Sequence, residues 1–295
     1  MGDLLLCILY GLSSTLMNIT SKTLISVYYV SPFYLLLLIQ YCIISLISLS
    51  KNYVVSWGEA KECAKISVLS ASNILLGSVG MKYVNLPMYI ALRKLCSAKI
   101  LIIDTFFFKK PLSASSFWGV SMITLGALIA GFNDLTSDIL GYLIVFLANL
   151  MNALLLIQIK QSKDKYASLE SLKQVIICSI ISIPFIIVLI YTFQELDQIS
   201  LSPYSEAWEL YFIIIFASLL GVICNLTLFK AANEISPIAT SVVGNAKDFI
   251  SIIIGYLAFG DVKGNFMFVI GLGISMFGAG IYSIGKLKEL RKVRV

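Results

Sequence analysis

The sequence predicts an all-α integral membrane protein with ten transmembrane helices, and three observations support this prediction. The chain of 295 residues is 59% hydrophobic and only 13% charged, a composition typical of membrane proteins. Ten apolar segments are each long enough to cross ~30 Å of hydrocarbon, which takes roughly 20 helical residues. The basic residues outside these segments gather on one side of the membrane. We therefore expect one polytopic domain over residues 1–295.

The ten segments follow one another with little chain between them. The first begins a few residues after Met1 without a basic leader, and we expect it to be retained as a span. The longest connections, 51–63 and 193–207, are too short for a soluble domain. The predicted spans are residues 4–27, 32–50, 64–81, 86–108, 114–132, 139–160, 172–192, 208–230, 237–259 and 265–285.

The distribution of Lys and Arg predicts the orientation of the chain. With the N-terminus in the cytoplasm, 15 of the 22 basic residues fall in cytoplasmic loops or in the basic tail 286–295, and the opposite loops hold only Lys82 and Lys263. Because basic loops are retained in the cytoplasm, we expect both termini there. The net charge of +6 is then explained by topology and by the adjacent anionic leaflet, and no nucleic-acid partner is expected.

The two halves of the chain share a weak internal similarity. Gly126 and Gly278, each followed by Ala, lie 152 residues apart near the middle of spans five and ten. Two five-helix halves, 1–132 and 139–285, would be inverted relative to each other because an odd number of crossings flips the second copy. Inverted repeats are a transporter architecture with the substrate site between the repeats.

Charged residues inside the predicted spans are the strongest indication of function. An ionisable group at mid-membrane costs at least ~2.5 kcal/mol unless it faces a cavity or a partner. The cations outnumber the acids, and ammonium and guanidinium groups that converge on a cavity would suit a phosphorylated substrate. The cations are Lys22, Arg93, Lys94, Lys99 and Lys247, and the acids are Asp104 and Asp248.

The alternative for each cation is snorkelling to the interface. Lys99 approaches the cytoplasmic end of its span, where contact with the interface or pairing with Asp104 is expected. Arg93 and Lys94 lie about 10 Å into the membrane at helical rise, where snorkelling is strained. Lys247 is far from both ends of its span, which favours a cavity-facing role, whereas Lys22 fits either interpretation.

Other functional classes fit the sequence less well. An intramembrane transferase is the principal rival, but the chain has no histidine and no paired carboxylates within the spans. We expect no catalytic residue, no metal site and no cofactor. A sugar-phosphate transporter would use the same basic residues. Four glycines of span ten permit close helix packing, either within the chain or in a homodimer; they are Gly271, Gly273, Gly278 and Gly280.

At several of these positions the chain resembles a known family. Residues 10–14 read Tyr-Gly-Leu-Ser-Ser and are followed by Lys22, residues 86–94 contain Leu-Pro-Met-Tyr and Leu-Arg-Lys, and residues 243–248 read Val-Gly-Asn-Ala-Lys-Asp. These motifs are similar to those of the nucleotide-sugar transporters in the drug/metabolite transporter superfamily, especially the UDP-sugar branch related to GDP-mannose transporters. The resemblance covers most of the chain.

The resemblance implies a function and a substrate site. The family exchanges a cytosolic nucleotide sugar for a lumenal nucleoside monophosphate by alternating access, usually in the Golgi or endoplasmic reticulum membrane. Carried over by position, it implies that Lys22, Arg93 and Lys247 help hold the diphosphate. The implied substrate-binding residues are Tyr10, Lys22, Arg93, Lys94, Gln174, Gly244, Asn245, Lys247 and Asp248.

Two departures from the family pattern bear on specificity. The Tyr-Asn element expected in span seven is missing, and within residues 173–178 only Gln174 offers a comparable amide. The choice between uridine and guanosine nucleotides is therefore left open. The second departure is Asp248, which stands where the UDP-sugar branch usually has Asn, and a carboxylate there should weaken anion binding unless it is paired or protonated.

Overall fold

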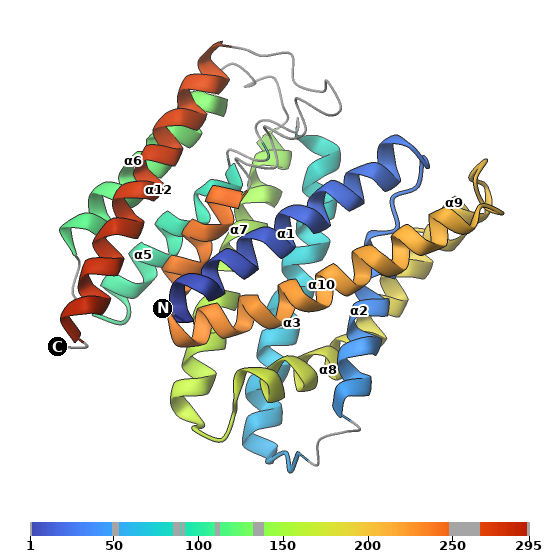
Figure 1. Ribbon diagram of the computed structural model, residues 1–295, viewed down its shortest axis with the longest axis horizontal. Helices are drawn as coiled ribbons and strands as arrows, with labels where there is room; N and C mark the ends of the chain where they lie inside the picture. Colours follow the sequence, from blue (N-terminus) through green and yellow to red (C-terminus); the bar gives the residue numbers. More distant parts are fainter. Residues whose placement is uncertain are drawn as a thin grey trace. The chain divides into compact units, whose positions relative to one another are not determined.

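The structure is a computed structural model, and the described residues form helices without strands (Figure 1). It describes residues 2–48, 53–84, 89, 92–109, 113–131, 139–247 and 266–293. Helical segments also cover residues 92–94 and 237–247. The helices are α1 (Gly2–Ser26), α2 (Phe33–Ser48), α3 (Trp57–Tyr83), α5 (Cys96–Phe106), α6 (Ala114–Gly131), α7 (Ile139–Lys165), α8 (Ser171–Thr192), α9 (Glu195–Ser200), α10 (Trp208–Glu234) and α12 (Phe266–Val293).

Several helices have the length and composition of membrane spans. Among the described residues, four helices are long and apolar enough to cross a bilayer: Trp57–Gly80, Ile139–Lys165, Ser171–Thr192 and Trp208–Glu234. Shorter apolar helices are Phe33–Ser48, Ala114–Ala130 and Val269–Gly285. The all-helical, multi-pass prediction is therefore confirmed, whereas the count of ten spans and the inverted repeat stay predictions.

The helix positions agree with most of the predicted spans. Helices α1, α2, α3, α6, α7, α8, α10 and α12 each cover one of them. Two differences are clear: the predicted span 86–108 is interrupted at Leu95, and the connection 193–207 contains the short helix α9. Hydropathy reports only how apolar a segment is on average, and it does not locate an interruption within the segment.

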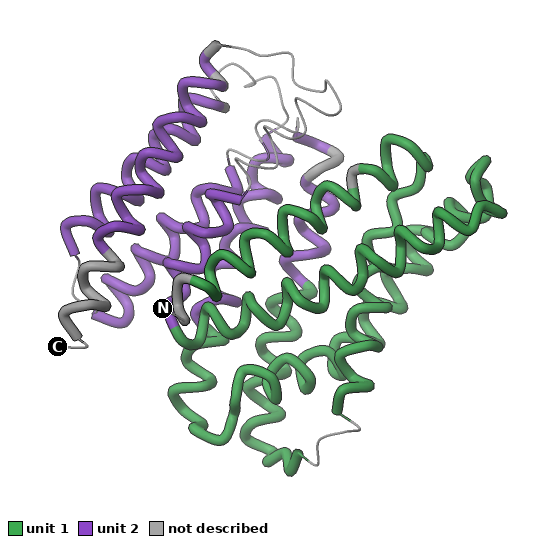
Figure 2. The backbone as a smooth tube through the Cα atoms, viewed as in Figure 1, with its two compact units in different colours: residues 1–71, 158–234 green, residues 72–157, 235–295 purple. Residues whose placement is uncertain are grey.

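The chain forms two compact units (Figure 2). Unit 1 comprises residues 1–71 and 158–234, and unit 2 comprises residues 72–157 and 235–295. Each unit draws on both predicted halves of the chain, and α3 and α7 each contribute residues to both units. Within unit 1, α1 packs along α10, and α2 packs against α8 and α10. Within unit 2, α6 packs along α12.

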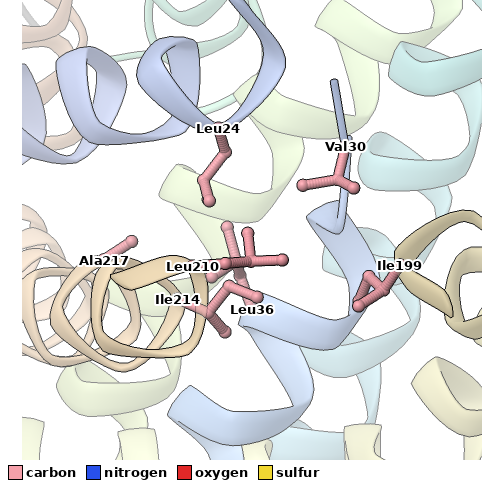
Figure 3. Packing of buried hydrophobic residues seen from close by; sticks show 7 residues of the cluster. All are labelled: Leu24, Val30, Leu36, Ile199, Leu210, Ile214 and Ala217. Carbon is pink, nitrogen blue, oxygen red and sulfur yellow. The ribbon is translucent and has the colours of Figure 1, made fainter. Parts of the chain in front are cut away.

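A buried cluster fixes one end of unit 1 (Figure 3). It joins α1, α2, α9 and α10, and its members are Leu24, Val30, Leu36, Ile199, Leu210, Ile214 and Ala217. Beside it, both carboxylate oxygens of Glu195 accept hydrogen bonds from the first turn of α2, from the Tyr34 N–H at 2.9 Å and the Leu35 N–H at 2.8 Å. A carboxylate at a helix N-terminus satisfies N–H groups that have no partner within the helix.

Helix α3 begins seven residues before the predicted span, at a capping box. The backbone N–H of Ser56 donates to Oε2 of Glu59 at 2.8 Å, and the N–H of Glu59 donates to the Ser56 hydroxyl at 3.3 Å. This reciprocal pair is a helix start signal that lies outside the apolar window. The extension places Glu59 and Glu62 on the first turns of the helix, where both are buried.

Glycines allow α6 and α12 to approach closely in unit 2. A Cβ atom on Gly126 would lie 2.4 Å from the Gly271 carbonyl oxygen, and one on Gly278 would lie 2.7 Å from the Gly119 carbonyl oxygen. The Ser275 hydroxyl also donates to the Ile123 carbonyl at 3.2 Å. Gly271 and Gly278 therefore pack within the chain, as small residues do between membrane helices.

Candidate functional site

The cationic segment of the fourth predicted span lies at an interruption of the helix. Residues 92–94 are helical, Leu95 forms a turn, and α5 begins at Cys96. The Leu95 N–H donates to the Leu92 carbonyl at 3.1 Å, a bond to the third residue back of the kind found in a 3₁₀ turn. Discontinuous helices expose backbone groups and are a common way for transporters to build polar sites within the membrane.

Arg93 presents its charge at this interruption. Its side chain is exposed, its Nη1 donates to the Tyr89 hydroxyl at 3.4 Å, and its guanidinium carbon lies 5.7 Å from the centre of the Tyr89 ring. Tyr89 is itself buried in a cluster with Val84, Ala127 and Val145. The tyrosine therefore offers a fixed aromatic and hydroxyl contact for an accessible cation. The neighbouring Lys94 differs, because it is only 2% exposed.

The predicted motif at residues 243–248 meets the same region. Asn245 is buried, and its Nδ2 donates to the Ser97 hydroxyl of α5 at 2.9 Å. The Ser97 hydroxyl also shares a hydrogen bond of 2.9 Å with Ser241, one turn earlier on the helical segment 237–247. Gly244 and Lys247 of this segment are partly buried. The structure thus brings the Asn245 segment against the start of α5, just after Arg93.

The remaining predicted residues that the structure describes lie in unit 1. Tyr10 of α1 is buried, with 7% of its surface exposed. Gln174 of α8 is completely buried: its Nε2 donates to the Ile159 carbonyl at 3.0 Å, and its Oε1 accepts from Nδ2 of Asn233 at 2.8 Å. Both ends of this amide thus join α8 to α7 and α10. The side chain of Lys22 and all of Asp248 lie outside the described residues.

Two amides near Arg93, on α7, were not expected from the sequence. Asn149 and Asn152 share a face of α7; Asn149 donates to the Leu92 carbonyl, and Asn152 donates to the Cys96 sulfur at 3.3 Å. Lys99 donates to the Phe146 carbonyl at 2.7 Å, and its Nζ lies 3.5 Å from the centre of the Phe146 ring. Two amides one turn apart in the apolar segment 139–160 were a signal that a survey of charged residues alone misses.

A second polar cluster joins α3, α7 and α8 in unit 1. Glu59 forms an ion pair with Lys173 at 2.6 Å, and both side chains are buried. Glu62 is held by Lys65 at 2.9 Å and by Lys165 at 2.8 Å. Its carboxylate also accepts from Nε2 of Gln158 at 2.8 Å. All of these cations are paired with carboxylates, which makes the cluster a structural connection between helices.

Comparison with protein families identifies the chain. The model of the UAA transporter family matches residues 4–286. The chain belongs to the UAA transporter family. Its relatives include a Dictyostelium discoideum protein, whose name refers to UDP-sugar transport, with 31% identity over 77% of this chain. An Arabidopsis thaliana UDP-N-acetylglucosamine transporter is 28% identical over 72% of this chain. A human nucleotide sugar transporter is 27% identical over 98% of this chain and 88% of its own length.

Membership of this family decides two predictions. The resemblance to nucleotide-sugar transporters is confirmed, and a transporter is favoured over an enzyme because the family and these relatives are transporters. This chain spans about three fifths of the first two relatives, 59% and 62% of their lengths.

A solved structure supports the fold independently. A protein crystal structure aligns with a TM-score of 0.60 over 97% of this chain and 98% of its own, at 10% sequence identity. At that identity, the similarity concerns the fold alone.

Proposed function

We propose that this member of the UAA transporter family carries a nucleotide sugar, most simply a UDP-sugar, in exchange for a nucleoside monophosphate. The observation that carries the proposal is the exposed Arg93 guanidinium at an interrupted helix. A guanidinium binds phosphate oxygens in a bidentate manner and keeps its charge at any physiological pH. The names of the relatives supply the substrate class, since these proteins are named as UDP-sugar or nucleotide-sugar transporters.

The proposal assigns a role to each predicted residue. Arg93 and Lys247 neutralise the diphosphate. Gly244 and Asn245, on the same segment as Lys247, contact the substrate beside them. Tyr10, Lys22 and Asp248 are further substrate-binding candidates from the family resemblance. The structure limits the role of Gln174, because its amide already bonds to Ile159 and Asn233. Gln174 would need to exchange one of these partners to contact a base, and the buried Lys94 would likewise need a rearrangement.

The proposed setting is the membrane of the Golgi or endoplasmic reticulum, with both termini in the cytoplasm and alternating access between two faces. The excess of basic residues in one set of loops supports this orientation. A second copy of the chain is proposed to pack against α12. Within the described part of the chain, Cβ atoms on Gly273 and Gly280 would meet no other atom within 4 Å, which leaves room on this side of the helix for lipid or a homodimer partner.

The experiment that tests the proposal is uptake into liposomes. Purified protein is reconstituted with internal UMP or GMP and offered a panel of radiolabelled UDP-sugars, GDP-sugars and sugar phosphates. Saturable uptake of a UDP-sugar that depends on internal UMP is the expected result. Dependence on GMP and a GDP-sugar would change the base, and uptake of sugar phosphates alone would overturn the proposed substrate class.

Two substitutions connect transport to the site. Arg93→Ala and Lys247→Ala should each abolish uptake while the protein remains monodisperse, because the diphosphate loses a charge-assisted contact. Lys61→Ala is the matched control: it removes the same charge from an exposed position at the start of α3 and should transport normally. Uptake at the wild-type rate by both site variants would contradict the proposed site.

A further inference from the structure

Asn149 is a buried amide in an apolar helix, and its hydrogen bond goes to the Arg93 segment. It lies on α7 and exposes only 2% of its surface. An amide within the membrane costs free energy unless its donors are satisfied. Its Nδ2 donates to the carbonyl oxygen of Leu92. That oxygen belongs to the peptide group that joins Leu92 to Arg93, so Asn149 holds the backbone directly before the cation.

The same carbonyl also takes part in the interruption of the helix. It accepts the Leu95 N–H at 3.1 Å, in a tighter turn than that of an α-helix. A carbonyl oxygen has two lone pairs, and here the turn and the amide each occupy one. Without Asn149 the turn would have to hold the peptide group by itself, and the backbone could rotate toward a regular helix.

Neighbouring amides hold the other side of the interruption. Asn152, one turn further along α7, donates to the Cys96 sulfur at 3.3 Å. Asn245 donates to the Ser97 hydroxyl at 2.9 Å. The first residues of α5 are therefore held by hydrogen bonds that do not involve Asn149. Of these three amides, Asn149 is the one that bonds to the peptide group between Leu92 and Arg93.

We propose that Asn149 is a positioning residue for the anion site, acting through the direction of Arg93. The guanidinium donates to the Tyr89 hydroxyl at 3.4 Å and its carbon lies 5.7 Å from the centre of the Tyr89 ring, so its position depends on the backbone from which the side chain extends. The direction in which Arg93 leaves the backbone therefore depends on the peptide group that Asn149 holds. This inference rests on the proposed function, since it assumes that Arg93 binds a phosphorylated substrate.

The test compares Asn149→Ala with Asn152→Ala in the purified 295-residue chain. One measurement is hydrogen–deuterium exchange of residues 92–96, which needs no substrate. The other is the KM and kcat of nucleotide-sugar uptake, for which loss of one hydrogen bond predicts about a fivefold rise in KM. We expect Asn149→Ala to accelerate exchange and to raise KM more than kcat changes, whereas Asn152→Ala should affect KM much less.

A double substitution separates positioning from a structural role. In an Arg93→Lys background, which keeps the charge and therefore some uptake, Asn149→Ala should raise KM by less than about twofold, because a flexible ammonium group makes no bidentate contact for Asn149 to position. An equal rise in both backgrounds would overturn the proposal, as would faster exchange with an unchanged KM.

Failure of the proposed function would give a different pattern. If the wild-type chain takes up no nucleotide sugar, the transport assignment is wrong, and exchange alone decides whether Asn149 orders the Arg93 segment. Unchanged exchange in Asn149→Ala then overturns the inference as well. Should that variant not fold, Asn149→Ser keeps a shorter donor and should change exchange and KM in the same directions by smaller factors.

Discussion

Adding a single methyl group at Gly126 tests the close packing of α6 and α12. A Cβ atom there would lie 2.4 Å from the Gly271 carbonyl oxygen and 2.5 Å from the Ser275 nitrogen, both of them backbone atoms. Real Cβ contacts are essentially never shorter than 3.0 Å. The two backbones must therefore separate by at least about 0.6 Å in Gly126→Ala.

The size of the effect follows from two opposing contributions. Overpacking of a tight interface costs about 1–3 kcal/mol, while replacing a helical glycine with alanine gains about 1 kcal/mol of helix propensity. Gly273→Ala is the matched control, since a Cβ on Gly273 meets no other atom within 4 Å. The propensity gain is common to both variants, so the difference between them measures packing and should be about 1–3 kcal/mol.

The assay is thermal unfolding of each purified variant in the same detergent, followed by tryptophan fluorescence. At about 2–4 °C per kcal/mol, Gly126→Ala should unfold roughly 2–12 °C below Gly273→Ala. A Gly126→Ala protein that unfolds at or above the temperature of Gly273→Ala would refute the close approach of the two helices.

Two further predictions concern buried carboxylates in unit 1. Glu59→Gln should lower the free energy of unfolding by about 3–5 kcal/mol because it leaves Lys173 buried without a counter-charge, and a Glu59→Gln, Lys173→Met double variant should recover most of the loss in thermal unfolding. Burial raises the pKa of Glu195 above its ordinary value, although the backbone N–H groups of Phe33, Tyr34 and Leu35 oppose that shift. The folded state then holds more protons than the unfolded state just above the ordinary pKa, so this contribution to stability is present at low pH and decreases as pH rises. Glu195→Gln should remove that dependence from unfolding midpoints measured between about pH 4 and 6, and the same slope in both proteins would contradict it.

The sequence predicted the helices well because each needed only information within its own segment. The apolar stretch at 172–192 and helix α8 nearly coincide, for example. The sequence did not show which groups on other helices form hydrogen bonds with these side chains. Lys99 was expected at the interface or paired with Asp104, yet its ammonium group bonds to the Phe146 carbonyl 47 residues away. Likewise, the amide of Gln174 looked available in the sequence, but Asn233 and Ile159 occupy it. Hydropathy cannot identify a partner on another helix.

The glycines of the last predicted span indicated close helix packing, but the sequence did not show what packs against them. Four glycines on the last span were compatible with packing within the chain or with a homodimer. Small residues allow a close approach, but they do not determine which helix makes it. The structure divides them: Gly271 and Gly278 meet backbone atoms of α6, whereas Gly273 and Gly280 face open space. The division was not predictable, because both pairs have the same spacing of seven residues.

The contact between α6 and α12 also bears on the predicted repeat. Gly119 and Gly126 on α6 correspond to Gly271 and Gly278 on α12 at the same separation of 152 residues. The contacts are reciprocal: Gly126 faces the Gly271 carbonyl, and Gly271 faces the Gly126 carbonyl at 2.5 Å. Gly119 and Gly278 face each other's carbonyls in the same way. Two copies of one segment related by a local twofold axis would make such contacts, because the contact of Gly126 with Gly271 then recurs between their counterparts, Gly278 and Gly119. The inverted repeat of the whole chain stays a prediction, and this reciprocal interface is the local feature that it would produce.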